Sequence, residues 1–388
     1  MRSALQLVEN TPFYRKELEL AASANGSEHS LHYSLPITEG CPPELAQYFI
    51  ERFSKKGEIV LDPFCGTGAI PLEAALRGRI PYASDPNPFF ARMAEAKTSP
   101  SDLTEVTLAL QGLQLRRPMD LKVYAEYFSH FYDVATFREL VQLRDWVHET
   151  GTPVARFIEL ISQSLLHGPS AGAFSVYTFP QISLRPEMQK ELNRKRNQAP
   201  DYRAVVPRIL RRTASLLRDG VPSAARQGAQ KGRFVSADAR NLNFISRPGV
   251  SLVVTAPPIP VTSNPAEDLW LRLWFSGIQA KEVSARHQSW QTLGCWLEFM
   301  SESLFELARV VSRGGRAVLV LKGLKIGSQL IDLDEELMAY VNANLSQYWE
   351  AECILVSKEP EARLKGAQAE RDQRKVSQRN RSLVLRRR

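Results

Sequence analysis

The stretch that decides the fold of this 388-residue chain is Glu58-Ile-Val-Leu-Asp-Pro-Phe-Cys-Gly-Thr-Gly-Ala-Ile-Pro-Leu-Glu73. Residues 59–61 form a short apolar run, which is typical of a buried strand in a parallel sheet. Gly66 and Gly68 allow the backbone to turn tightly and to approach a ligand closely. A helix is expected to begin near Ala69. A strand, a glycine-rich turn and a helix in this order predict a ligand-binding turn.

An acidic residue ends the next expected strand. Residues 79–85 read Arg-Ile-Pro-Tyr-Ala-Ser-Asp, so Asp85 follows the glycine turn by about 20 residues, where a doubly wound sheet places a ribose-binding carboxylate. Two other glycine motifs do not fit. The turn lacks the Gly-Lys-Ser/Thr ending of a phosphate loop, and the third glycine of a dinucleotide fingerprint is missing.

Asp62-Pro-Phe-Cys-Gly-Thr-Gly68, followed by Ser84-Asp-Pro-Asn-Pro88, resembles the cofactor half of S-adenosylmethionine-dependent methyltransferases. More narrowly, it is similar to enzymes that methylate the exocyclic amino group of a DNA base, at cytosine N4 or adenine N6. The resemblance implies a Rossmann-like α/β fold with a doubly wound, mostly parallel sheet, and S-adenosylmethionine as cofactor. The implied cofactor-binding residues are Asp62, Pro63, Phe64, Gly66, Gly68, Asp85 and Asp238, the last near the adenine ring. A structural strand, turn and helix without a ligand is the alternative.

The composition is ordinary for a soluble globular protein. No apolar run approaches the length of a membrane span and no signal pattern opens the sequence, so we expect a cytoplasmic location. The four cysteines lack paired spacing, which indicates reduced thiols and neither disulfides nor a metal site.

The expected organisation is one methyltransferase domain interrupted by a helical insertion. An N-terminal arm (1–28), with a helical pattern over residues 15–24, would precede the cofactor-binding half (29–100). Apolar periodicity then predicts helices over residues 103–113, 121–131, 136–149, 154–166 and 202–217, within an insertion spanning 101–230 that would recognise the target. The catalytic half (231–357) and a basic loop with a terminal strand (358–388) would complete the chain. We expect residues 361–380 to form that loop.

The net charge of +8 is concentrated in two basic stretches, residues 185–227 and 358–388, each with 11 Lys and Arg against 4 acids. Two such stretches on an otherwise mildly acidic chain favour a nucleic-acid partner, either DNA or RNA, although solvated helix faces would give the same pattern. An aromatic and hydroxyl-rich loop at residues 167–180 precedes the first stretch, and flat rings beside cations suit exposed bases. The candidate contacts are Arg185, Lys190, Arg194, Lys195, Arg196, Arg208 and Arg212.

A Pro-Pro turn marks the expected catalytic position at Thr255-Ala-Pro-Pro-Ile259. The resembled family places Asp, Asn or Ser before the two prolines and an aromatic residue after them. There the polar side chain and the first proline's carbonyl accept hydrogen bonds from the amine, while the ring stacks on the flipped base. Ala256 and Ile259 supply neither group, so only the carbonyl of Pro257 remains, with Pro258 completing the turn.

Two functions therefore compete. The first is a methyltransferase for the amino group of a DNA base, with altered chemistry at residues 255–259, where Thr255, Thr262, Ser263 or Asn264 could lend an oxygen. The second is a catalytically silent relative that binds DNA. An RNA methyltransferase with a relaxed turn is a third possibility. A cytosine carbon-5 mechanism is disfavoured because no cysteine lies near the turn.

Overall fold

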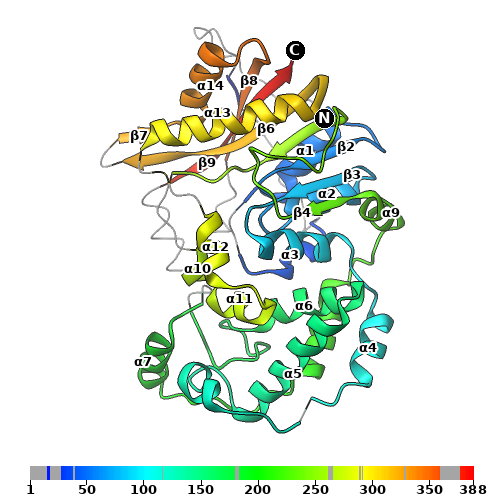
Figure 1. Ribbon diagram of the computed structural model, residues 1–388, viewed down its shortest axis with the longest axis vertical. Helices are drawn as coiled ribbons and strands as arrows, with labels where there is room; N and C mark the ends of the chain where they lie inside the picture. The colour runs from blue at the N-terminus through cyan, green and yellow to red at the C-terminus, as the bar shows by residue number, and fades with distance from the viewer. Residues whose placement is uncertain are drawn as a thin grey trace.

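The computed structural model describes residues 15–17, 28–37, 40–115, 117–179, 183–260, 265–287, 290, 292–326, 329–358 and 376–388. Within these ranges the chain forms one nine-stranded sheet with helices on both faces and a helical region beside it (Figure 1). Thr262, Ser263, Asn264 and most of the basic stretch 358–388 lie outside the described residues.

The sheet has the doubly wound order β1-β8-β9-β6-β5-β2-β3-β4, with β7 paired to β6. Neighbouring strands are parallel, except that β9 runs antiparallel to β6 and β8, and β7 antiparallel to β6. Strand order reverses between β2 and β5, and ligands of such sheets bind at the carboxyl ends of the strands at this switch point. The strands are β1 (Arg15–Glu17), β2 (Ile59–Asp62), β3 (Ile80–Ser84), β4 (Arg233–Val235), β5 (Val250–Thr255), β6 (Val311–Ile326), β7 (Gln329–Ile331), β8 (Trp349–Lys358) and β9 (Val376–Arg387).

Successive strand residues feed two separate cores. Val60 and Val254 pack under α1 (Pro43–Phe53) and α2 (Ala69–Leu76), whereas Leu61 and Val253 pack under α13 (Leu293–Val310) and α14 (Leu333–Asn344). Because side chains alternate across a strand, a strand buried on both faces needs a continuous apolar run. The run at residues 59–61 therefore forms the central strand that its sequence predicts.

The helical region is the lower half of Figure 1 and buries a third core of its own. Its helices come from three parts of the chain: before the glycine turn, between β3 and β4, and after the Pro-Pro turn. Its elements are η1 (Ser30–Ser34), α3 (Pro88–Thr98), α4 (Leu103–Gln111), η2 (Tyr124–Phe128), α5 (Val134–Thr150), α6 (Pro153–Leu165), α7 (Pro186–Arg196), α8 (Val205–Leu216), α10 (Pro265–Asp268), α11 (Trp270–Ser276) and α12 (Ala280–Arg286). Helix α9 (Ser223–Lys231) packs on α2.

Three sequence expectations differ from the structure. Residues 15–17 form β1, parallel to β8, where a helix over 15–24 was expected; the rest of that helix falls outside the described residues. Edge pairing with β8 overrides the local helical pattern. The expected helix over 121–131 is a π-helical turn at residues 124–128. The expected loop 361–380 ends earlier, because β9 begins at Val376; residues 361–375 are not described.

Candidate active site

The glycine turn lies at the carboxyl end of β2, over the start of α2. Gly66 and Gly68 both adopt positive φ, at 47° and 78°, in the left-handed region that glycine tolerates. Gly68 also allows close packing, because a Cβ there would lie only 2.7 Å from Cα of Ala94 in α3. Both glycines are therefore required, one by backbone conformation and the other by conformation and close approach.

Asp85 follows β3 beside this turn, as the sequence predicts. Its Oδ2 accepts a hydrogen bond from the amide of Gly66 at 3.1 Å, and its Oδ1 accepts from the amide of Asn87 at 2.9 Å. Burial raises the pKa of the Asp85 carboxyl to about 6, although both amide hydrogen bonds lower it. The carboxyl is thus fixed in place with lone pairs to spare, as a receptor for sugar hydroxyls requires.

Asp238 is brought next to Asp85 through the backbone. The amide of Asp85 donates to the carbonyl of Val235 at 3.4 Å, and the amide of Ala237 donates to the carbonyl of Asp85 at 3.2 Å. The Asp238 carboxylate accepts two hydrogen bonds from the guanidinium of Arg240, at 3.0 and 2.9 Å. Partial burial raises the pKa of Asp238, but the hydrogen bonds from Arg240 outweigh it and hold that pKa below its usual value.

A cavity of about 360 Å³ opens beside these acids, between the ends of β3 and β4 and helix α12. Its walls are Pro86, Ser236, Ala237, Asp238, Arg240, Ala285 and Arg286. A larger hollow of about 670 Å³ lies against the same Asp238 and Arg240 but is walled by α13 residues such as Glu302 and Phe305. Of these two cavities only the smaller is lined by Pro86, the residue after Asp85, so it is the one nearer to that acid.

A hydrogen bond joins the glycine turn to the Pro-Pro turn. Oγ1 of Thr255, at the end of β5, donates to Oδ1 of Asp62, at the end of β2, at 2.6 Å. Both side chains are almost fully buried, and the amide of Phe64 donates to the same Asp62 oxygen at 3.2 Å. Burial raises the pKa of Asp62 to about 7, although both of these hydrogen bonds lower it. Thr255 is therefore committed to Asp62 as a donor.

The Pro-Pro turn itself is tied to the cores of the sheet. Indole Nε1 of the fully buried Trp296, in α13, donates to the carbonyl of Pro258 at 2.8 Å. Ala256 is half-buried against the α1 and α2 side, and Ile259 is half-buried against the α13 and α14 side. Sequence reasoning did not find Trp296, because nothing local distinguishes it from other apolar residues of its helix.

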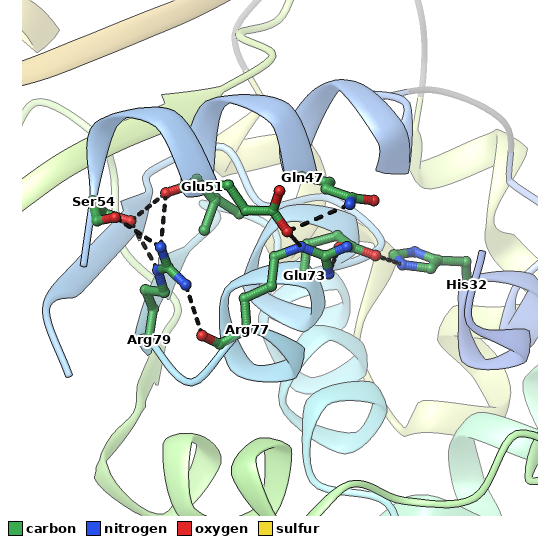
Figure 2. Close-up of polar contacts among 8 residues, drawn as sticks. His32, Gln47, Glu51, Ser54, Glu73, Arg77 and Arg79 are labelled. Carbon is green, nitrogen blue, oxygen red and sulfur yellow. Dashed lines mark hydrogen bonds and ion pairs between the residues drawn. The ribbon is translucent and has the colours of Figure 1, made fainter. Parts of the chain in front are cut away.

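A polar network links η1 and α1 to α2, the helix that begins at the glycine turn (Figure 2). Nε2 of His32, in η1, lies 2.6 Å from Oε1 of Glu73, in α2, and Glu73 also pairs with Arg77. Arg77 pairs in turn with Glu51 of α1 at 2.9 Å. Burial lowers the pKa of His32, while Glu73 raises it. This network fixes η1 and α1 against the helix that starts at the glycine turn.

The segment after the Pro-Pro turn is anchored in the helical region. Arg272 of α11 is fully buried, with Nη1 2.9 Å from Nε2 of His167. Gln163 of α6 donates from Nε2 to the carbonyl of Arg272 at 3.1 Å and to Oγ of Ser276 at 2.8 Å. His167 thus has the structural role expected of a single histidine.

The predicted nucleic-acid residues fall into two groups. Lys190 and Arg194 are exposed on α7 without an ion pair among the described residues. The others already have partners: Arg185 pairs with Glu267, Lys195 with Glu191, and Arg196 lies 3.8 Å from the ring centre of Tyr177. In α8, Arg208 donates to the carbonyl of Ala204 at 3.4 Å, and Arg212 donates to the carbonyl of Tyr33 and to Ser164.

Comparison with known proteins agrees with this geometry. Residues 21–96 match the model of the N6/N4 DNA methylases. Over this segment the chain is similar to the N6/N4 DNA methylases. The segment contains η1, the glycine turn and Asp85, and the methylase cofactor is S-adenosylmethionine. The groups at this site fit that molecule. An acid with free lone pairs adjoins the glycine turn, and a cavity large enough for a nucleoside lies beside them.

Two further proteins were compared with the chain, one similar to part of its sequence and one compared by structure. The tRNA (guanine(10)-N2)-dimethyltransferase of Methanocaldococcus jannaschii is 38% identical over 74 residues, which is 19% of this chain and 21% of that protein. The chain thus matches about a fifth of that relative's length. A TehB-like SAM-dependent methyltransferase from Corynebacterium glutamicum is 10% identical, covering 88% of this chain and 87% of that one, with a TM-score of 0.32. That score is too low to support a common function.

Two absences concern only the residues described above. No group of three or more His, Cys, Asp or Glu side chains in those ranges could hold a metal ion. In the same ranges, no helix is long and apolar enough to cross a bilayer.

Proposed function

We propose that the chain is an S-adenosylmethionine-dependent methyltransferase for the exocyclic amino group of a DNA base, cytosine N4 or adenine N6. The hydrogen bond between Asp62 and Thr255 is the observation that carries the proposal. It holds the cofactor turn of the methylase segment against the Pro-Pro turn, so the two sites adjoin at the switch point of the sheet.

The proposed assignments follow the strand ends. Asp85 would accept hydrogen bonds from the ribose hydroxyls, and the adenine would occupy the cavity walled by Pro86 and Asp238. Gly66 and Gly68, with Asp62, Pro63 and Phe64, would form the turn around the methionine end. When bound, the cofactor supplies an electrophilic methyl group on a sulfonium sulfur.

At the target side, the carbonyl of Pro257 is the acceptor proposed to orient the amine. The carbonyl of Pro258 is already occupied by Trp296, which fixes the turn and leaves the first proline's carbonyl to the substrate. Exposed Lys190 and Arg194 of α7 would contact phosphates. We expect slow methyl transfer, because Ala256 and Ile259 offer neither an acceptor nor a stacking ring.

The test begins with calorimetric binding of S-adenosylmethionine to the full chain, with Asp85→Ala as control. Loss of one hydrogen-bonded charged group should weaken binding about 10- to 100-fold. Transfer of labelled methyl groups to single- and double-stranded DNA and to RNA follows. No binding at millimolar cofactor would rule out the methyltransferase.

An RNA substrate is the second candidate, because the relative that shares 74 residues with the chain is named as a tRNA methyltransferase. Methyl incorporation into RNA but not into DNA would select it. Cofactor binding with no transfer to either nucleic acid would select a silent, DNA-binding relative. The core packing of Ala256 and Ile259 is what favours that outcome.

A further inference from the structure

Lys97, in the last turn of α3, is a buried amine that lacks a partner. Its side chain is 1% exposed, yet its ammonium makes no hydrogen bond or ion pair with any residue that the structure describes. Burying a charged amine without a partner is costly, so a native protein rarely retains one without a function. Burial lowers the pKa of Lys97 to about 7, an effect that the nearby Cys65 thiol opposes.

The position of Lys97 points to the glycine turn. Ala94, three residues earlier, packs so closely on Gly68 that a Cβ there would meet its Cα at 2.7 Å. Residues three apart share a helix face, and long helical side chains lean toward the helix N-terminus. We therefore expect the Lys97 amine to lie toward the turn, and its electrostatic interaction with Cys65, the residue before Gly66, agrees with that direction.

The acids around this turn are already occupied. Glu73 is bound by His32 and Arg77, as Figure 2 shows. Asp85 accepts from the amides of Gly66 and Asn87. Asp62 accepts from Thr255 and from the amide of Phe64. These three carboxylates therefore already have hydrogen-bond donors other than Lys97.

Backbone donors at the glycine turn are also open. The amides of Thr67, Ala69 and Ile70, where α2 begins, make no hydrogen bond within the described residues. A helix N-terminus attracts anions, and here a buried cation accompanies it. The glycine turn thus has open amides and a buried cation near it, in addition to the acid at Asp85.

We propose that Lys97 binds the carboxylate of the methionine end of S-adenosylmethionine. The assignment rests on the proposed function, since it requires that cofactor. The cofactor carries one anionic group, its carboxylate, besides a sulfonium and an ammonium, so a buried cation beside it can attract only that group. Asp85 is the residue proposed to bind the ribose hydroxyls, which leaves Lys97 and the open amides for the amino acid. No sequence motif marks Lys97; its only signal is a charge on the apolar face that carries Met93 and Ala94.

The experiment compares the cofactor with its decarboxylated analogue, in which only the carboxylate is missing. Calorimetry on the full chain measures both ligands with wild type, Lys97→Met and Lys122→Met, the last replacing an exposed lysine in the helical region. Lys97→Met should weaken cofactor binding about 10- to 100-fold and change the affinity of the analogue less than about 2-fold. Lys122→Met should change neither.

Stability provides a readout that does not depend on the ligand. Without cofactor, Lys97→Met should raise the urea midpoint, because an apolar side chain replaces an amine buried without a partner. The variant is therefore expected to fold, and Lys97→Arg should recover part of the lost affinity.

Equally weakened binding of both ligands, or unchanged cofactor binding, would overturn the assignment of Lys97 alone. Loss of affinity for single-stranded DNA instead would assign Lys97 to a phosphate. A wild type that binds neither ligand would overturn the proposed function as well.

Discussion

The turns after β2 and β5 end neighbouring strands of one sheet, but they are built differently. The turn after β2 has two glycines at positive φ, open backbone amides and fixed acids around it. The turn after β5 has both prolines, but its two variable positions carry Ala256 and Ile259, which pack toward opposite cores. The contrast teaches that the turn proposed to hold the cofactor can keep its polar groups while the adjoining turn, proposed to face the target, has the packing of a structural turn.

The glycine turn should be the more fragile of the two. Gly68→Ala would place a Cβ 2.7 Å from backbone Cα of Ala94, in addition to the strain of φ 78°. We expect the free energy of unfolding to fall by about 2–5 kcal/mol, the sum of left-handed strain and overpacking. Urea denaturation measures this loss.

Gly66→Ala is the matched control. Its φ is 47°, but a Cβ there would meet no atom within 4 Å. Only the strain remains, at about 1–2 kcal/mol. If both variants unfolded at the same urea concentration, close packing between α3 and the glycine turn would not be what distinguishes Gly68.

Restoring the second turn should show whether the rest of the site is competent. Ala256→Ser with Ile259→Tyr supplies an oriented acceptor and a stacking ring, so labelled methyl transfer to nucleic acid should rise about 100-fold. Ala256→Ser with Ile259→Leu is the control without a ring, and it should gain less. A double variant that binds cofactor like wild type but transfers no methyl group would place the defect outside residues 255–259.

Much of this contrast could be predicted from sequence. The turn at Gly66 and Gly68 and the place of Asp85 after the next strand were predicted correctly, because both follow from spacing along a short stretch of sequence; their roles in binding remain predictions. The unusual residues Ala256 and Ile259 were likewise visible at the Pro-Pro turn. Residues 15–17 were wrongly predicted as helix, because pairing with β8, more than 300 residues away, decides their structure.

Groups that depend on distant contacts were not predictable. Lys97 looks like an ordinary helical lysine until tertiary packing buries it, and Trp296 is one apolar residue among several in α13. The bond between Asp62 and Thr255 spans 193 residues. Each depends on tertiary packing, and no local pattern encodes it. The domain limits expected at residues 28, 100, 230 and 357 remain predictions.

The hold of α13 on the Pro-Pro turn can be tested through Trp296→Phe. The variant leaves the Pro258 carbonyl without the indole donor, which should cost about 1–3 kcal/mol of stability. Added to the double variant Ala256→Ser with Ile259→Tyr, it should also lower methyl transfer about 10-fold, because the turn loses its fixed orientation.

Trp349→Phe separates the two effects. Its indole donates to the carbonyl of Leu304 at 3.0 Å, also in a buried position but away from the turn. We expect a similar loss of stability with unchanged methyl transfer. If both variants lowered transfer equally, general loosening of α13 would explain the result, and no specific role of the Pro258 contact would be needed.

The last prediction concerns the hydrogen bond that joins the two turns. Burial raises the pKa of Asp62 to about 7, so between about pH 4 and pH 7 the folded state holds a proton that the unfolded state has released. Stability contributed by this proton is present at low pH and is lost as pH rises through 7, with a slope of at most about 1.4 kcal/mol per pH unit. Asp62→Asn keeps an acceptor for Thr255 but cannot titrate, so its urea midpoints should fall less steeply over this range.

Asp85 must be separated from Asp62, because its carboxyl also has a raised pKa, at about 6, and lies close enough to raise that of Asp62. Asp85→Asn should flatten the slope mainly below about pH 6, whereas Asp62→Asn should flatten it up to about pH 7. An unchanged slope in Asp62→Asn would mean that Asp62 is ionised throughout. Thr255 would then donate to a carboxylate at neutral pH, and the link between the turns would be a charge-assisted hydrogen bond that strengthens both sites together.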